Sequence, residues 1–315
     1  MKAPILVTGA AGFVGANLLR RLTGETDPKQ IHLFLRRGLN NWRIQNLLKK
    51  VNPHSVDLGN APAVNRLVRE IKPKTVFHLA AHGAYPSQQD DEAEIIRTNI
   101  GGTFALMQSC LQAGCGAFVN TGTSSEYGPK RNPMRESDAL APITSYAASK
   151  AWATLYGQYQ ALAQKAPIVT LRLFSVYGAY EPSGRLIPNI ILGLLRQETI
   201  RLSSPQTVRD FIFIEDAVDA YLAAAARPLK GPVFNVGTGR QTSIREIFDL
   251  LSQILKIKTK PVWDKSLRRS FDTSYWVADP GLSRRQLGWQ AKTDLRQGLS
   301  ETAIWFKNNL HLYAG

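Results

Sequence analysis

The sequence predicts an α/β fold built on a doubly wound parallel sheet, because short apolar segments rich in β-branched residues alternate with longer segments of helical spacing. A glycine-rich turn directly after the first apolar segment is the second observation. Parallel strands are continuously apolar because helices cover both faces of their sheet. The expected strands fall within residues 4–8, 31–35, 75–80, 117–121 and 168–174 (PILVT, IHLFL, TVFHLA, AFVNT and IVTLRLF). Ligands of such a sheet bind at the carboxyl ends of its strands.

The alternation of strands and helices weakens after Tyr177, where the segment GAYEPSGRLIPN is rich in Pro and Gly. A chain of 315 residues is long enough for two lobes around one site. We expect a Rossmann-like dinucleotide-binding lobe in residues 1–176, to which residues 210–237 return. A smaller α/β C-terminal lobe for the substrate is expected mainly from residues 177–209 and 238–315. Its segments are helices within residues 187–197, 243–255 and 295–309; a strand within 208–214 and a helix within 215–226 lead back to the first lobe.

The composition is that of a globular protein that attracts anions. Hydrophobic residues make up 44% and charged residues 20%, and the net charge is +15 with a pI near 9.9. The basic residues are spread along the chain in short pairs, without a long basic tail or a basic stretch interleaved with aromatics. We therefore expect no nucleic-acid partner, and a site for a polyphosphate small molecule is the better use of excess arginine.

Other features exclude a membrane protein and a metal site. No segment reaches the ~18 apolar residues of a membrane span, and the apolar run in MKAPILVTGAAG is too short for a signal peptide. Cys110 and Cys115 fit no usual zinc or disulfide spacing, which predicts a cytoplasmic protein. His, Cys and carboxylate residues show no metal-ligand spacing, so no metal is expected.

The turn in ILVTGAAGFVGANLLRRL places Gly9, Gly12 and Gly15 between an apolar strand and an amphipathic helix. The G-x-x-G-x-x-G pattern becomes informative through that strand and helix. Gly9 permits the tight turn, Gly12 lets a pyrophosphate approach the backbone, and Gly15 lets helix and strand pack closely. The turn predicts a dinucleotide site with its phosphates at the start of the helix.

The end of the second strand decides which nicotinamide cofactor is expected. An acidic residue there would bind the ribose 2′-hydroxyl of NAD, but the sequence reads LFLRRG, with Arg36 and Arg37. A guanidinium fork pairs with a 2′-phosphate, so NADP(H) is preferred and NAD(H) is possible. Asp57, which closes a short strand in SVDLGN, is expected to accept a hydrogen bond from the adenine amino group.

Seven signatures follow one another in order: the glycine turn, VFHLAA, TNIGGT, YAASK, RLFSVYG, RDFIFIEDAVDAY and FNVGTG. With them the chain resembles the extended short-chain dehydrogenase/reductases, specifically the nucleotide-sugar epimerase/dehydratase group, over nearly its whole length. The resemblance implies a Rossmann lobe for NAD(P), a smaller lobe for a nucleoside-diphosphate sugar, and a homodimer paired through helices. By matching position it also implies cofactor contacts at Phe13, Val14, Leu58, Leu79, Ala80, Ala81, Asn99 and Phe174.

Tyr146 and Lys150 are the expected catalytic pair, because residues four apart share one face of a helix. A phenol ordinarily loses its proton near pH ~10, and a neighbouring ammonium lowers that pKa and can also hold the nicotinamide ribose. Tyr146 would then exchange a proton with a sugar hydroxyl or carbonyl while hydride moves to or from the nicotinamide. Thr123 would hydrogen-bond the same sugar oxygen and orient it.

The residues after Thr123 separate the possible reactions. Relatives that dehydrate sugars at carbons 5 and 6 carry an acid–base pair directly after the matching hydroxyl, whereas this chain has Ser124 and Ser125. Neither serine can act as a carboxylic acid, and Glu126 is expected to point to the other side. A 4,6-dehydratase is therefore disfavoured, and Ser124 and Ser125 are expected to contact the substrate.

The resemblance also implies residues on the substrate side. Arg209 and Arg269 are expected to clamp the diphosphate, since each can bind an oxyanion bidentately. His78 is expected to be a satisfied core histidine. Further substrate contacts are expected at His82, Ser175, where many relatives have Asn, Arg185 and Asn189.

Two reactions remain, and both need only Thr123, Tyr146 and Lys150. One is the reduction of a 4-keto sugar nucleotide by NADPH, and the other is reversible 4-epimerisation with retained NAD. The two arginines favour reduction. A non-catalytic dinucleotide sensor is the alternative of another class, and the intact catalytic set argues against it.

Overall fold

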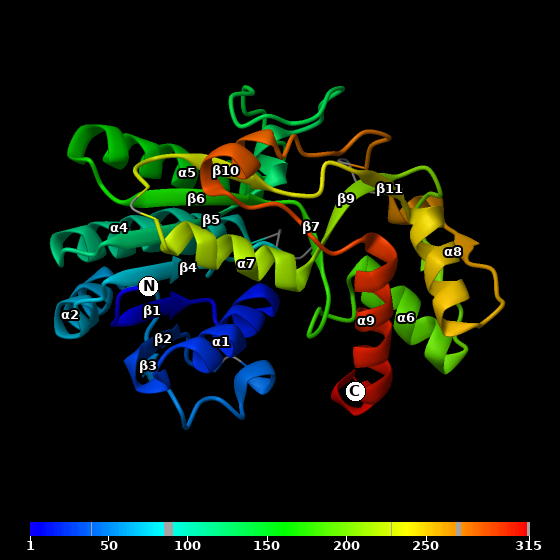
Figure 1. The fold of residues 1–315 in the computed structure, drawn as a ribbon, viewed down its shortest axis with the longest axis horizontal. Helices are drawn as coiled ribbons and strands as arrows, with labels where there is room; N and C mark the ends of the chain where they lie inside the picture. Colours follow the sequence, from blue (N-terminus) through cyan, green and yellow to red (C-terminus); the bar gives the residue numbers. More distant parts are fainter. Residues whose placement is uncertain (39, 85–90, 228, 269–271, 314–315) are drawn as a thin grey trace.

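The computed structural model of the chain describes residues 1–38, 40–84, 91–227, 229–268 and 272–313 (Figure 1). Its large sheet is formed by β1 (Ile5–Thr8), β2 (Ile31–Leu35), β3 (Asn52–Ser55), β4 (Thr75–His78), β5 (Ala117–Thr123), β6 (Ile168–Leu173) and β10 (Val233–Val236). The strands lie in the order β10-β6-β5-β4-β1-β2-β3, and all neighbours are parallel. The predicted doubly wound sheet is confirmed. Because the strand order reverses between β1 and β4, a crevice opens at their carboxyl ends.

Helices cover both faces of the large sheet. On one face α1 (Phe13–Glu25) packs against α7 (Ile214–Ala225), and their apolar residues join those of the sheet in one core. On the other face lie α2 (Ala61–Ile71), α4 (Thr103–Gln112) and α5 (Ser145–Gln164), which enclose a second apolar cluster. Ahead of α4, α3 (Glu92–Ile95) continues into a π-helical segment, Ile96–Gly102. Cys110 and Cys115 are buried free thiols in the second cluster.

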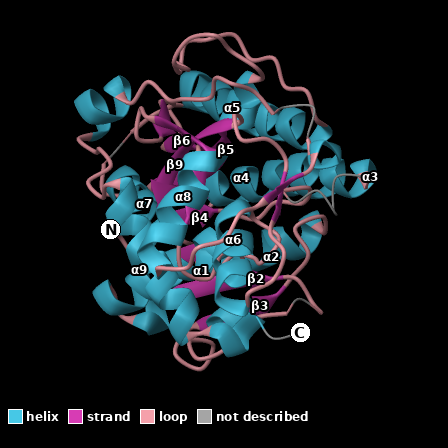
Figure 2. Cartoon of the chain, turned by 90° about the vertical axis from the view of Figure 1, so that its right-hand side faces the viewer, coloured by secondary structure: helices cyan, strands magenta, loops and turns pink. Residues whose placement is uncertain are grey.

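A smaller group of elements lies beside the large sheet, at the right of Figure 1 and facing the viewer in Figure 2. It contains the helices α6 (Leu186–Arg196), α8 (Ile244–Leu255) and α9 (Leu295–Asn308). Its strands are β7 (Ser175–Tyr177), β9 (Val208–Phe213) and β11 (Gln241–Ser243), and a separate pair is formed by β8 (Arg201–Leu202) and β12 (Val262–Trp263).

Strand β9 belongs to the smaller group of elements. It lies between β7 and β11 in the three-stranded sheet and not in the large sheet. The chain returns to the large sheet through α7 and β10. β9 pairs in parallel with β7, which follows β6 directly in the sequence. The division into a dinucleotide lobe and a substrate lobe stays a prediction.

His78 lies in the core between β1, β4 and α4, and its side chain is fully buried. Nδ1 pairs with the Thr8 hydroxyl at 2.7 Å and Nε2 with the Thr103 hydroxyl at 2.8 Å. Burial, helped by the charge of Lys150, lowers the pKa of His78 to about 3. A neutral imidazole with both nitrogens bonded is a structural histidine, as the sequence predicts.

None of the helices in the described residues combines the length and apolar character needed to cross a membrane. In the same part of the chain, no three His, Cys, Asp or Glu side chains gather as a metal site.

Candidate functional site

A cavity of about 1040 Å³ lies at the carboxyl ends of β1, β2, β4, β5 and β6 and extends to the small sheet. Among the described residues, all predicted site residues line it except Arg37 and Asn99. Arg269, the second predicted diphosphate clamp, lies outside the described residues. The fold thus brings the glycine turn, the catalytic set and most of the predicted substrate contacts to one cavity.

The glycine turn is built for close approach of backbone. Gly9 has φ +73°, and a Cβ there would lie 2.5 Å from the backbone nitrogen of Ala80 at the end of β4. A Cβ on Gly15 would lie 2.2 Å from the Gly9 carbonyl oxygen. Helix α1 begins at Phe13 without a side-chain cap, so its first amides are left for a ligand. This cradle fits the pyrophosphate of a dinucleotide.

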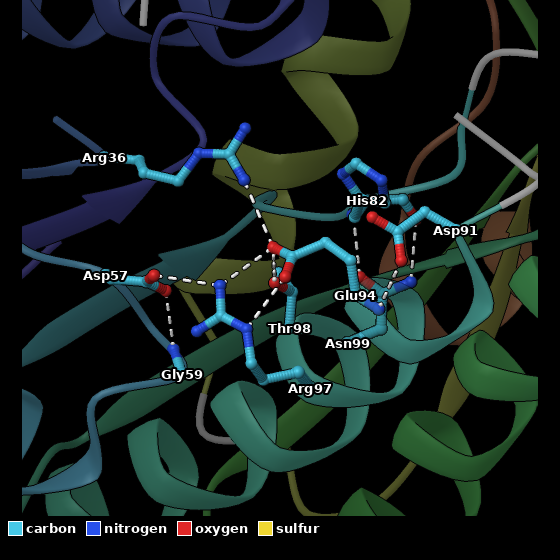
Figure 3. Close-up of polar contacts among 9 residues, drawn as sticks. All are labelled: Arg36, Asp57, Gly59, His82, Asp91, Glu94, Arg97, Thr98 and Asn99. Carbon is cyan, nitrogen blue, oxygen red and sulfur yellow. Dashed lines mark hydrogen bonds and ion pairs between the residues drawn. The ribbon is translucent and has the colours of Figure 1, made fainter. Parts of the chain in front are cut away.

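A network of charges surrounds the expected adenosine end of the cavity (Figure 3). Arg36 forms an ion pair with Glu94 at 3.2 Å, and Arg97 bonds the second Glu94 oxygen at 2.8 Å. Arg97 also bonds Asp57 at 2.9 Å, and this hydrogen bond lowers the pKa of Asp57. The Arg36 guanidinium is therefore already paired with Glu94. Arg97 likewise binds Asp57, the carboxylate that was expected to accept a hydrogen bond from the adenine.

Two predicted cofactor residues lie outside the cavity wall. Arg37 is exposed and is not among the described residues that line the cavity. Asn99 is 1% exposed. Its amide oxygen accepts a hydrogen bond from the His82 backbone nitrogen at 2.8 Å, and its amide nitrogen donates to the His82 carbonyl oxygen at 2.9 Å (Figure 3). The same amide nitrogen contacts the Ser149 hydroxyl of α5 at 2.9 Å. Asn99 thus supports the backbone at His82, which lines the cavity, and its own contact with the cofactor stays a prediction.

Tyr146 and Lys150 lie one turn apart near the start of α5 and line the cavity. Thr144 caps the helix by accepting a hydrogen bond from the Ala147 backbone nitrogen at 3.1 Å. The Lys150 side chain is buried, and this burial lowers its pKa to about 8, although the charge of Glu126 opposes the shift. The cation therefore lies in a poorly solvated place, where its effect on a neighbouring phenol is strong.

Thr123 ends β5 and begins the turn that carries the serines. Its hydroxyl accepts a hydrogen bond from the Ser125 backbone nitrogen at 3.2 Å, and its own backbone nitrogen donates to Glu126 at 2.8 Å. The other oxygen of Glu126 pairs with Arg172 at 2.8 Å, with both side chains buried. Glu126 therefore points into the protein, while Thr123, Ser124 and Ser125 line the cavity.

The substrate side is organised around strand β9. Asp210 is fully buried and accepts hydrogen bonds from the backbone nitrogens of Thr238, Gly239 and Ala278, at 2.8 to 3.1 Å. The neighbouring Arg209 points into the cavity wall and bonds Asp272 at 2.8 Å. Because successive side chains of a strand point to opposite faces, Asp210 faces the protein interior while Arg209 faces the cavity.

A second arginine of this side, Arg185, bonds Glu181 at 3.2 Å. Burial raises the pKa of Glu181 to about 7, and its other oxygen has no partner among the described residues. His82, Ser175 and Asn189 line the same cavity as predicted.

The residues that line the cavity without having been predicted include Trp42, Glu181 and Trp276. Each lies outside the seven signatures, on a loop or a single 3-10 turn. Trp42 contacts Tyr180 and Tyr313, which joins the segment after β2 to the end of the chain. Only an Arg-rich or aromatic composition near these loops could have signalled them, and such a composition does not specify a contact.

Comparison with known proteins agrees with this geometry. A family model described as the NAD dependent epimerase/dehydratase family matches residues 5–237. The chain belongs to this family. The predicted resemblance is therefore confirmed, and the protein is an enzyme of the epimerase/dehydratase type.

Individual relatives of this family member differ in their reactions. A UDP-glucose 4-epimerase of Mycolicibacterium smegmatis is 29% identical, over 96% of this chain and 98% of its own. The UDP-glucose 4-epimerase of Thermotoga maritima, solved with UDP-glucose, has a TM-score of 0.89 at 26% identity, covering 97% of this chain and 99% of that one. A trifunctional UDP-glucose 4,6-dehydratase/UDP-4-keto-6-deoxy-D-glucose 3,5-epimerase/UDP-4-keto-L-rhamnose-reductase of Arabidopsis thaliana is 26% identical over 97% of this chain, which spans 47% of that protein.

Replacing Glu126 with Gln is expected to lower the free energy of unfolding by about 3 kcal/mol, because Arg172 is then buried without its counter-charge. The double variant Glu126→Leu/Arg172→Met, which removes both charges, should recover most of this loss. Urea unfolding followed by circular dichroism measures both.

The matched control is Glu70→Gln, which breaks a pair with Arg66 whose side chains are 72% and 61% exposed. It should leave the unfolding midpoint nearly unchanged. Equal midpoints for Glu126→Gln and Glu70→Gln would contradict the structural role assigned to the buried pair.

Proposed function

We propose that this family member oxidises and reduces carbon 4 of a nucleoside-diphosphate sugar. The carrying observation is that Thr123, Tyr146 and Lys150 line the cavity that also holds the glycine turn. A proton-transfer group and a dinucleotide cradle in one cavity are what such a reaction needs. The reaction takes one of two forms, 4-keto sugar reduction or 4-epimerisation.

In the proposed mechanism the bound nicotinamide supplies the acceptor or donor of hydride. Tyr146, as phenolate, takes the proton of the sugar hydroxyl when the carbon is oxidised and returns it when the carbonyl is reduced. Lys150 stabilises that phenolate with its charge. The Thr123 hydroxyl accepts the Ser125 amide on one of its two lone pairs and donates its hydrogen to the same sugar oxygen.

Dehydration at carbons 5 and 6 is not part of the proposal. It needs an acid and a base beside the sugar, and positions 124 and 125 carry serines. The nearby carboxylate, Glu126, is occupied by Arg172 and by the Thr123 backbone.

Separate observations support the two forms. The pair Arg36 and Arg37 supports NADP(H) and therefore reduction. The names of the relatives, two of them UDP-glucose 4-epimerases, support epimerisation with retained NAD. Because both forms use the same three catalytic residues, cofactor exchange and product configuration distinguish them.

The proposed NADP(H) preference depends on whether Arg36 pairs with Glu94 or with the 2′-phosphate of the cofactor. A 2′-phosphate at Arg36 has to compete with Glu94, which Arg97 and Thr98 hold in place. Arg37 is exposed and is left for that phosphate. The balance of these charges sets the ratio of the NADP(H) to the NAD(H) affinity.

We also propose a homodimer formed through α4 and α5, in the cytoplasm as the cysteine content predicts. Four large side chains on these helices are exposed: Phe104 by 47%, Leu155 by 55%, Tyr159 by 57% and Leu162 by 86%. Exposed apolar side chains gathered on adjacent helices are typical of a protein–protein interface.

Replacing Tyr146 with Phe is expected to reduce turnover by about a thousandfold while cofactor binding is kept, because only the proton-transfer oxygen is lost. Nicotinamide absorbance with 4-keto-6-deoxy sugar nucleotides, and product analysis with UDP-glucose, measure the two forms. The control is Tyr159→Phe on the same helix, which keeps the aromatic ring at the proposed dimer interface and should keep full activity.

The pH dependence of wild-type turnover is a second readout of this catalytic set. Activity should fall on the alkaline side with a midpoint near the pKa of Lys150, about 8, because the neutral amine no longer stabilises the phenolate. If the enzyme turns over none of the CDP, dTDP, GDP and UDP sugars, the proposed function is contradicted.

Replacing Glu94 with Gln is expected to raise the ratio of NADP(H) to NAD(H) affinity about tenfold, because Arg36 is freed for the 2′-phosphate. Arg37→Ala should change the ratio in the opposite direction. Titration calorimetry with both cofactors measures the ratio, and a wild type that binds NAD(H) more tightly than NADP(H) contradicts the proposed preference.

Replacing Leu162 with Asp is expected to convert the dimer into a monomer, because a carboxylate is then buried in an apolar interface. Sedimentation equilibrium measures the mass. Ile304→Asp, at an apolar residue 60% exposed on α9, is the control and should remain dimeric. A monomeric wild type contradicts the proposal.

A further inference from the structure

A tryptophan from the segment after the 3-10 turn η6 (Lys265–Leu267) reaches the catalytic turn. The Trp276 indole nitrogen donates a hydrogen bond to the Ser124 hydroxyl oxygen at 3.1 Å, across 152 positions of sequence. Trp276 is 4% exposed and Ser124 is 6% exposed, yet both line the cavity. The contact therefore joins the substrate side to the residue next to Thr123.

Trp276 is held on several sides. Its backbone nitrogen donates to the Gln241 side chain at 3.1 Å, and its ring belongs to a buried cluster with Tyr127 and Phe174. The Arg209 guanidinium lies over the indole, with its carbon 5.4 Å from the ring centroid. A side chain fixed in this way gives its hydrogen-bond partner a fixed direction.

The bond determines what Ser124 can offer a ligand. An indole nitrogen is only a donor, so Ser124 accepts from it and keeps its own hydrogen. Among the described residues, Trp276 is the hydrogen-bond partner of this hydroxyl. Thr123 is arranged likewise, since its oxygen accepts from the Ser125 amide. Two adjacent hydroxyls thus have an occupied lone pair and a hydrogen available to the cavity.

Both hydroxyls cannot serve the same sugar oxygen equally. The oxygen on the reacting carbon already meets Tyr146 and Thr123 in the proposed mechanism, and a carbonyl oxygen has two lone pairs. The hydrogen of Ser124 is therefore available to an oxygen on a neighbouring part of the sugar. A hydroxyl oxygen there satisfies it, whereas a methyl or methylene group leaves it buried without a partner.

We propose that Trp276 determines sugar specificity by fixing Ser124 as a donor to an oxygen beside the reacting carbon. For a reaction at carbon 4, that oxygen is on carbon 3 or carbon 6. Trp276 acts through Ser124 and is a positioning residue. The inference rests on the proposed function and names the substrate class within it. These substrates are nucleotide sugars that carry an oxygen on carbon 3 or carbon 6 able to accept the Ser124 hydrogen.

The test compares a nucleotide sugar that the wild type turns over with its 3-deoxy and 6-deoxy analogues. The wild type should show kcat/KM at least about tenfold lower for one analogue, as expected when a buried donor loses its partner. Trp276→Phe keeps an aromatic ring and removes the indole nitrogen, and Ser124→Ala removes the hydroxyl. Both should bring the ratio between parent and analogue to within about twofold, mainly by slowing the parent sugar.

A double variant and a matched control separate this role from packing. Trp276→Phe/Ser124→Ala should behave as Ser124→Ala alone, because both changes remove one interaction. Trp289 is the control, since it is 5% exposed and its indole donates to the Asp216 carbonyl oxygen at 2.9 Å, away from the cavity lining. Trp289→Phe should keep the wild-type ratio even if it lowers the unfolding midpoint.

The outcomes distinguish this inference from the function on which it rests. If the wild type turns over no nucleotide sugar, the proposed function fails and the inference fails with it. If the wild type reacts but treats both analogues like the parent, or if Trp276→Phe discriminates as well as the wild type, the inference alone is overturned. Should Trp276→Phe fail to fold, Ser124→Ala decides, since retained discrimination in that variant overturns the inference.

Discussion

The buried ion pair between Glu126 and Arg172 determines the geometry of the catalytic turn. One carboxylate oxygen binds the guanidinium and the other binds the Thr123 backbone, so the pair also fixes the direction in which β5 ends. Gly122 makes room for it, because a Cβ there would lie 2.6 Å from the carboxylate. Removing two charges from water is unfavourable unless their bonds are well made, and here the pair orders the residues that face the cavity.

The same pair contributes to the electrostatics around Lys150. The Lys150 amine is buried, which alone disfavours its charge, and the Glu126 carboxylate opposes that effect. Arginines lining the cavity add positive charge, and the acidic residues nearest them are paired with arginines. A positive cavity suits the polyphosphate ligand of the proposed function and accounts for part of the net charge of +15.

Local patterns predicted much of the fold and the site. The strands β1, β2, β4, β5 and β6 of the large sheet follow from apolar runs, and Gly9, Gly15, Tyr146 and Lys150 follow from spacing within one turn or one strand–helix unit. The contacts that were missed join distant positions. Trp276 and Ser124 are 152 residues apart, and a sequence pattern carries no information about which loops meet.

The charge network at the adenosine end shows the same limit. Arg36 and Asp57 were predicted individually, yet their environment depends on Glu94 and Arg97, which come from the far side of β4. The strand β9 was expected in the correct place along the chain, but its pairing with β7 and β11 was not predicted, because apolar alternation does not reveal the neighbour of a strand.

Asp210 has a consequence for altering substrate choice. Its three backbone partners lie in the loop after β10 and in the segment ending at Ala278. One carboxylate therefore connects two segments that are distant in the sequence. A specificity loop grafted from another member of the family would have to bring amides to the same points around this aspartate. Chimeras that exchange single side chains on this scaffold are therefore structurally simpler than chimeras that exchange whole loops.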